Sequence, residues 1–106
     1  MDQQKLSECV AALRAERGSD LRDLFAADPT RFERFSVRFD DLLIDLSKCA
    51  LTAQTMDLLA QAADAAGVDE RRAAMFAGQK INLTEDRAVL HTALRNRDGQ
   101  VLLDGQ

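Results

Sequence analysis

Three side chains in the last quarter of the chain could together hold an anion. Arg87, His91 and Arg95 are spaced i, i+4 and i+8, so a helix through them would place all three on one face. Two guanidinium groups and an imidazole on one face could bind a phosphate or a carboxylate. Alternatively, the arginines pair with nearby acids such as Asp86 and Asp98 or donate to backbone carbonyls of a neighbouring element, and His91 is a packing residue.

A second polar group lies where a strand is expected to end. Asp45 and Lys48 flank Ser47 in the sequence. This pattern is consistent with a polar site at the strand end. The interpretation we favour is a charged turn that caps the following segment.

Other patterns typical of catalysis or ligand binding are absent from the sequence. The five glycines are scattered, so they form no phosphate-binding loop, and the chain has one histidine and no Ser/His/Asp arrangement. Cys9 and Cys49 lack the spacing of metal ligands, and we expect two reduced, semi-buried thiols. These patterns by themselves therefore single out no catalytic, cofactor-binding or metal-binding residue.

In the first half of the chain, short helices followed by a β-hairpin are expected to position these groups. Apolar residues at helical spacing over 6–13 predict a helix that ends near Gly18. Ser19 or Asp20 is expected to cap a second, short helix, with Leu21, Leu24 and Phe25 on one face. Asp28-Pro29 predicts the start of a third helix, with Phe32 and Phe35 on a shared face. Alternation over Ser36 to Ser47 predicts two strands with Asp40-Asp41 as the turn.

In the second half the pattern is helical. Thr52 is expected to cap a helix with a continuous apolar face up to Ala66, closed by Gly67. Asp69 is expected to cap a short helix through Phe76, ended by Gly78, and Thr84 to cap a last helix with the apolar face Val89, Leu90, Ala93 and Leu94. A turn at Asp98-Gly99 and a short extended segment at 101–103 are expected to follow.

Composition agrees with a mainly α fold that carries a small β-hairpin, in a single region spanning 1–106. Ala and Leu far outnumber Val and Ile, which favours helix over sheet. The 18 acidic and 14 basic residues give a net charge of −4, which argues against nucleic-acid binding. No stretch is apolar enough to cross a membrane, and the N-terminus does not resemble a signal peptide, so we expect a cytoplasmic protein.

The stretch from Arg72 onwards is similar to a block near the start of glucose-6-phosphate isomerases. It contains Met75-Phe76-Ala77-Gly78, then Ile81-Asn82-Leu83-Thr84-Glu85, then the run from Arg87 to Arg95 that reads Arg-Ala-Val-Leu-His-Thr-Ala-Leu-Arg. Asp45-Leu46-Ser47-Lys48 resembles a further segment of this family, in which an aromatic residue usually stands at position 46. Cys49 and Gln79 stand where the family commonly has Asn and Glu. The resemblance runs from about Leu24 to the end of the chain.

The resemblance implies an N-terminal piece of a much longer enzyme. Members of this family fold as two αβα sugar-isomerase (SIS) domains, and this chain would be the N-terminal helical region, truncated before the parallel sheet. They interconvert glucose 6-phosphate and fructose 6-phosphate in glycolysis and gluconeogenesis through a carboxylate base, without a metal or organic cofactor. The base and the phosphate loops belong to later sequence, so we expect the 106-residue chain alone to be inactive.

The resemblance also implies partners. The parent enzyme is expected to be a homodimer that binds sugar phosphate only as a whole, and the hairpin and the helix over 52–66 are expected to pack against the remainder of the isomerase chain. The alternative is a stand-alone helical protein-interaction module. In that case Leu58-Leu59-Ala62 and Leu90-Ala93-Leu94 would pack together or on a partner helix, and the Arg87, His91 and Arg95 stripe would dock an acidic partner. The length of the match favours the isomerase.

Overall fold

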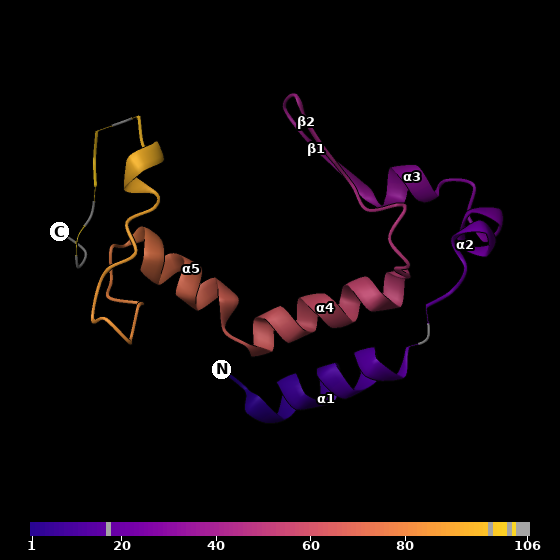
Figure 1. Ribbon diagram of the computed structural model, residues 1–106, viewed down its shortest axis with the longest axis horizontal. Helices are drawn as coiled ribbons and strands as arrows, with labels where there is room; N and C mark the ends of the chain where they lie inside the picture. The colour runs from indigo at the N-terminus through magenta and orange to yellow at the C-terminus, as the bar shows by residue number, and fades with distance from the viewer. Residues whose placement is uncertain (17, 98, 102, 104–106) are drawn as a thin grey trace. The chain divides into compact units, whose positions relative to one another are not determined.

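In the described residues, helices and one β-hairpin make up the regular structure (Figure 1). The computed structural model describes residues 1–16, 18–97, 99–101 and 103. Two compact units form, one of Gln4–Ala62 and one of Met1–Gln3 with Ala63–Gln106. The expectation of a mainly helical chain with a small hairpin is confirmed.

The first helix, α1 (Gln3–Ala15), follows its apolar stripe. Leu6 and Val10 are half-buried, and Cys9 between them is 5% exposed. Both cysteines are free, but the expectation that both are semi-buried is wrong. Cys9 points from the inner face of a helix and is buried, whereas Cys49 lies in a turn and is exposed.

Of the next two helices, the first begins at an acidic cap as predicted, whereas the predicted cap of the second at Asp28 is wrong. Helix α2 (Leu21–Ala27) is capped by Asp20, whose carboxylate accepts from the backbone N–H of Arg22 at 2.8 Å. Helix α3 (Arg31–Arg34) begins later than the Asp28-Pro29 signal, because Asp28 accepts from both the backbone N–H and the hydroxyl of Thr30 and so forms a turn before the helix.

The hairpin consists of β1 (Ser36–Phe39) and β2 (Leu42–Asp45), which pair antiparallel and follow α3. Asp40-Asp41 is the turn, as predicted, and Asp40 has a positive φ of 53°. The register places apolar residues opposite one another in the pairs Val37↔Ile44 and Phe39↔Leu42. Arg38↔Leu43 lies between these pairs, and Ser36↔Asp45 is the pair farthest from the turn.

Helix α4 (Ala53–Ala65) confirms the predicted cap at Thr52. The Thr52 hydroxyl accepts from the Thr55 backbone N–H at 3.0 Å, and the Thr52 backbone N–H donates to the Thr55 hydroxyl at 3.1 Å. Thr55 in turn donates its hydroxyl to the carboxylate of Glu16, which ties the start of α4 to the residue after α1.

Helix α5 (Val68–Phe76) follows α4 after Gly67, which has a positive φ of 74°. The predicted cap at Asp69 is wrong, because α5 begins one residue earlier and Asp69 lies inside its first turn. There the Asp69 carboxylate forms an ion pair with Arg72 at 3.1 Å. The predicted end at Phe76 is confirmed.

The predicted helix from Thr84 is absent, and this expectation is wrong. Residues 83–86 form a turn that is closed by backbone hydrogen bonds of 3.1 and 3.2 Å between Asn82 and Arg87. The Asn82 side chain accepts from the Thr84 hydroxyl and the Glu85 backbone N–H, so it holds the turn that a helix would have to open. Only a short 3₁₀ helix, Ala93–Arg95, follows within the described residues.

Several expectations near the end of the chain meet a different outcome. The stand-alone helical module required an apolar helix face over 90–94, and this face does not form. Gly99 has a positive φ of 79°, which fits a turn there, but Asp98 lies outside the described residues. Leu102, the middle residue of the extended segment predicted at 101–103, also lies outside them.

Few side chains are buried in the described part of the chain. The buried apolar side chains are Cys9, Phe35 and Ala65, and the buried polar ones are Arg31 and Ser47. Among the described helices, none combines the length and the hydropathy needed to span a bilayer. The buried polar pair therefore marks the most enclosed position in the unit that contains the hairpin.

Candidate functional site

The predicted anion site does not assemble in the described structure. Without a helix over 84–95, Arg87, His91 and Arg95 share no face, and all three are exposed. The Arg95 guanidinium donates to the backbone carbonyl of His91 at 2.8 Å. The alternative prediction, that the arginines donate to backbone carbonyls, therefore holds for Arg95. The carbonyl belongs to its own turn rather than to a neighbouring element.

An open hollow of about 600 Å³ lies beside these residues. Its lining consists of the apolar residues Phe76, Leu90, Ala93 and Val101 and the polar residues Thr92, Arg95, Asn96 and Gln100. The described structure has no group of three or more His, Cys, Asp or Glu side chains arranged to hold a metal ion. Arg95 is thus the one member of the predicted anion site among the residues that line this hollow.

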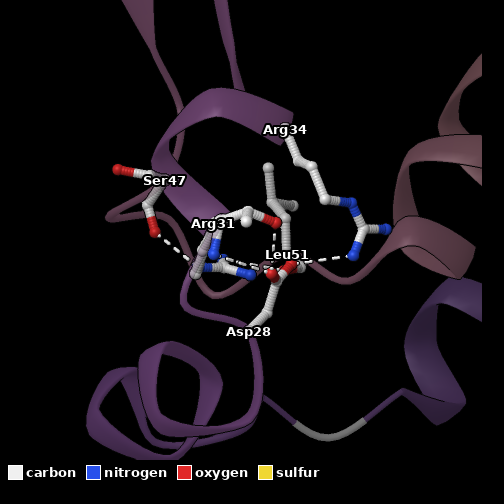
Figure 2. A network of polar contacts seen from close by, with 6 residues as sticks. Asp28, Arg31, Arg34, Ser47 and Leu51 are labelled. Atoms are coloured by element: carbon white, nitrogen blue, oxygen red, sulfur yellow. Dashed lines mark hydrogen bonds and ion pairs between the residues drawn. The ribbon is translucent and has the colours of Figure 1, made fainter.

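The Arg31 side chain makes three hydrogen bonds, and all three go to backbone carbonyls of one later segment (Figure 2). Its Nε donates to the carbonyl of Ser47 at 2.8 Å, and its Nη2 donates to the carbonyls of Cys49 at 2.8 Å and Leu51 at 2.9 Å. These acceptors belong to the segment that joins β2 to α4. The planar guanidinium suits this task because its donors form a rigid fork.

Aromatic rings cover the Arg31 guanidinium, and the side chain is 2% exposed. Its Cζ lies 4.4 Å from the centre of the Phe35 ring and 5.7 Å from that of Phe25. Within the described residues no carboxylate pairs with it, so carbonyl dipoles and ring faces hold the charge. We call Arg31 and the segment 47–51 the arginine clamp.

A second polar cluster flanks the arginine clamp. Arg34 forms an ion pair with the carboxylate of Asp28 at 2.7 Å, one helical turn from Arg31 (Figure 2). Hydrogen bonds from the side chain and backbone N–H of Thr30, together with the nearby Arg34, lower the pKa of Asp28 below its usual value. This cluster fixes the turn from which α3 begins.

Asp45, Ser47 and Lys48 lie in a capped turn at the end of β2, so the interpretation of these residues as a charged turn is confirmed. The Asp45 carboxylate accepts from the backbone N–H of Ser47 at 2.8 Å, and Ser47 is 1% exposed. Hydrogen bonds from the side chain and the backbone N–H of Ser47 lower the pKa of Asp45, and the charge of Lys48 adds to this. Asp45 therefore holds the turn that presents the Ser47 carbonyl to Arg31.

Acid should weaken this turn. Because folding lowers the pKa of Asp45 below 3.8, its charge stabilises the fold above that pH, and the gain is lost as the pH falls through the lower folded pKa. At neutral pH we expect the free energy of unfolding to be higher for the unchanged chain than for an Asp45→Asn variant. This difference in free energy should vanish well below pH 4. Urea unfolding at a series of pH values measures this.

The control is Asp41→Asn. The Asp41 carboxylate lies in the hairpin turn and caps no backbone N–H in the described structure. The difference in free energy of unfolding between this variant and the unchanged chain should therefore depend little on pH. An Asp45→Asn difference that stays constant from pH 6 to below pH 3 would contradict the capping role.

Sequence reasoning missed Arg31. Its acceptors are backbone carbonyls that follow 16 to 20 residues later, and no side-chain spacing marks such a contact. A weak signal existed, because Arg31 is an arginine near several phenylalanines. The clamp has the geometry of a structural anchor, since one buried guanidinium donates to three backbone carbonyls.

Comparison with known proteins identifies the family. A family model for phosphoglucose isomerase matches residues 45–106, which is more than half of the chain. A glucose-6-phosphate isomerase of Mesorhizobium japonicum is 56% identical over 110 aligned residues, covering 100% of this chain and 20% of the relative. One of Rhizobium meliloti is 57% identical (91% of this chain, 18% of the relative), and one of Agrobacterium fabrum is 52% identical (95% and 19%).

The chain thus spans about a fifth of the length of the curated relatives it matches. The match begins at the capped turn of Asp45 and runs through α4, α5 and the turn closed by Asn82 and Arg87. The model matches most of the chain, and relatives more than half identical align along all or nearly all of it. The chain therefore belongs to the phosphoglucose isomerase family.

Proposed function

We propose that this chain is the N-terminal part of a glucose-6-phosphate isomerase and that it has no isomerase activity alone. The observation that carries the proposal is the 56% identity to the Mesorhizobium japonicum enzyme across the entire chain. The reaction interconverts glucose 6-phosphate and fructose 6-phosphate. It belongs to the whole enzyme, of which this chain matches about a fifth.

The requirements of the reaction support the proposal that the rest of the enzyme supplies the catalytic groups. Aldose–ketose isomerisation needs a base held within about 3 Å of a carbon-bound proton, in a site largely closed to water. The carboxylates of Asp28 and Asp45 instead hold backbone N–H groups in turns. The role we assign to the chain is to support the architecture around an active site that the rest of the enzyme supplies.

We further propose the parent architecture and setting. The chain is the helical region that precedes the parallel sheet of an αβα sugar-isomerase (SIS) fold, and the parent enzyme is a cytoplasmic homodimer without a cofactor. The described helices and the antiparallel hairpin are compatible with this placement. Sedimentation of the whole enzyme would measure the oligomeric state.

A chimera tests the proposed function. In the Mesorhizobium japonicum enzyme, the segment that matches this chain is replaced by the chain itself, and conversion of fructose 6-phosphate is coupled to glucose-6-phosphate dehydrogenase and read as NADPH absorbance. We expect the chimera to be active. The enzyme with the segment deleted and the purified 106-residue chain should both be inactive.

Two results would contradict the proposal. A folded chimera without turnover would show that this chain is not equivalent to the matching segment. Turnover by the purified chain would show that the catalytic groups lie within these 106 residues.

A further inference from the structure

One face of the β-hairpin is entirely apolar and exposed. The pairs Val37↔Ile44 and Phe39↔Leu42 place four apolar side chains on the same side, because side chains alternate between the two faces of a strand. We call them the hairpin face. They are 64% (Val37), 48% (Ile44), 78% (Phe39) and 55% (Leu42) exposed. The opposite face carries Ser36, Arg38, Leu43 and Asp45 and is mainly polar.

The hairpin face continues towards α4. A hollow of about 230 Å³ is lined by Val37 together with Phe35, Leu46, Ala53 and Met56. Val37 belongs both to the hairpin face and to this hollow, so a continuous apolar surface extends from the hairpin to the first turn of α4. Arg34 and Asp57 also line the hollow, and Asp40 and Asp41 flank the far end at the turn. An apolar centre with charged edges is the usual composition of a docking surface.

This surface requires a cover. A two-stranded hairpin is marginal in water unless its apolar face packs on another element. An exposed apolar patch on an otherwise charged chain marks an interaction site. Within the described residues, no strand other than β1 and β2 joins the sheet.

The small size of the surface indicates which partner covers it. A stable dimer interface uses about 20–30 residues on each side, which is far more than the hairpin face and its hollow provide. A segment of the same polypeptide can be held by a small surface, because it does not lose the translational freedom that a separate molecule loses. The relatives supply such a segment, since about four fifths of their length lies outside the match.

We propose that the hairpin face docks the remainder of the isomerase polypeptide, through an apolar surface that this remainder presents. The inference rests on the proposed function, because it requires that the chain belongs to a longer isomerase. It adds which surface makes the contact and which side of the hairpin faces inwards. The polar side of the hairpin, with Arg38 at its centre, then faces solvent.

Thiol labelling of two adjacent positions tests this directly. Phe39→Cys places a thiol on the hairpin face, and Arg38→Cys places one on the opposite face of the same strand. Each variant is made both in the 106-residue chain and in the Mesorhizobium chimera. The rate of iodoacetamide modification is read peptide by peptide by mass spectrometry, which separates the new thiol from Cys9 and Cys49.

We expect the thiol of Phe39→Cys to react at least about tenfold more slowly in the chimera than in the chain, and that of Arg38→Cys to react at similar rates in both. Equal rates for Phe39→Cys in the two proteins would overturn the inference. Protection in the isolated chain that grows with its concentration would also overturn it, because the cover would then be a second copy of this chain.

A second variant and a separate readout keep the result unambiguous. Val37→Cys tests the same face if Phe39→Cys does not fold, as judged by circular dichroism. Labelling does not depend on turnover. An inactive chimera with a protected Phe39→Cys thiol would contradict the proposed function alone, and an active chimera with an unprotected thiol would contradict the docking inference alone.

Discussion

The Arg31→Met variant of the chain is expected to lose about 3 kcal/mol of the free energy of unfolding. Methionine keeps an apolar side chain against Phe35 but removes the donors that serve the carbonyls of Ser47, Cys49 and Leu51. A buried acceptor left without a donor costs about 1–3 kcal/mol, and the Ser47 bond lies in the buried part of the clamp. Urea unfolding followed by circular dichroism measures the loss.

The matched control is Arg34→Met, one helical turn away. Arg34 is also an arginine near Phe35, but its side chain is 55% exposed and its partner is the carboxylate of Asp28. Loss of an exposed ion pair should cost about 0.5 kcal/mol. If the two variants were destabilised equally, the arginine clamp would be no more important than a surface contact.

The Gly67→Val variant is expected to lose about 2 kcal/mol. Gly67 joins α4 to α5 with a φ of 74°, and its backbone N–H and C=O are bonded to Asp64 and Arg71. A β-branched residue is strained in this left-handed conformation. An added Cβ would also lie 3.3 Å from the carboxylate of Glu70, so the side chain of Glu70 would have to shift. Urea unfolding again measures the change.

Gly18 offers a control for the same substitution. Its φ lies outside the left-handed region, and an added Cβ would meet only the Cβ of Ala50 at an ordinary 3.7 Å. Gly18→Val should therefore change stability by less than about 0.5 kcal/mol. A loss as large as that of Gly67→Val would attribute the effect to glycine replacement in general rather than to the φ of Gly67.

The elements over residues 3–76 could be predicted from the sequence because local signals define them. Asp20 and Thr52 cap their helices with their own side chains, and the alternation in the hairpin determines which residues share a face. Such signals involve neighbours a few residues apart, so they can be read without knowledge of the rest of the fold.

The helix expected after Thr84 fails for a reason that is also local. Asn82, two residues before the proposed cap, bonds the Thr84 hydroxyl and the Glu85 backbone N–H, and Lys80 pairs with Asp86 at 2.8 Å across the same turn. A helix of this length depends on packing for its stability. Leu94, on its expected apolar face, is 86% exposed and provides little of that packing.

The contacts of Arg31 could not be predicted, because the sequence pattern records side chains and the acceptors are backbone atoms. The predicted anion site failed through its dependence on the missing helix. At Asp45 the favoured prediction, a charged turn, is confirmed by the hydrogen bond from the Ser47 backbone N–H, and the structure adds that Ser47 is buried.

The backbone acceptors of Arg31 have a consequence for how this segment can vary among homologous enzymes. A peptide carbonyl is chemically the same whichever side chain its residue carries, so a substitution at position 49 should keep the acceptor that Arg31 binds there. Cys49, which stands where the resemblance places Asn, is a substitution of this kind. The side chain at position 49 can therefore change while an arginine 18 residues before it keeps its contact.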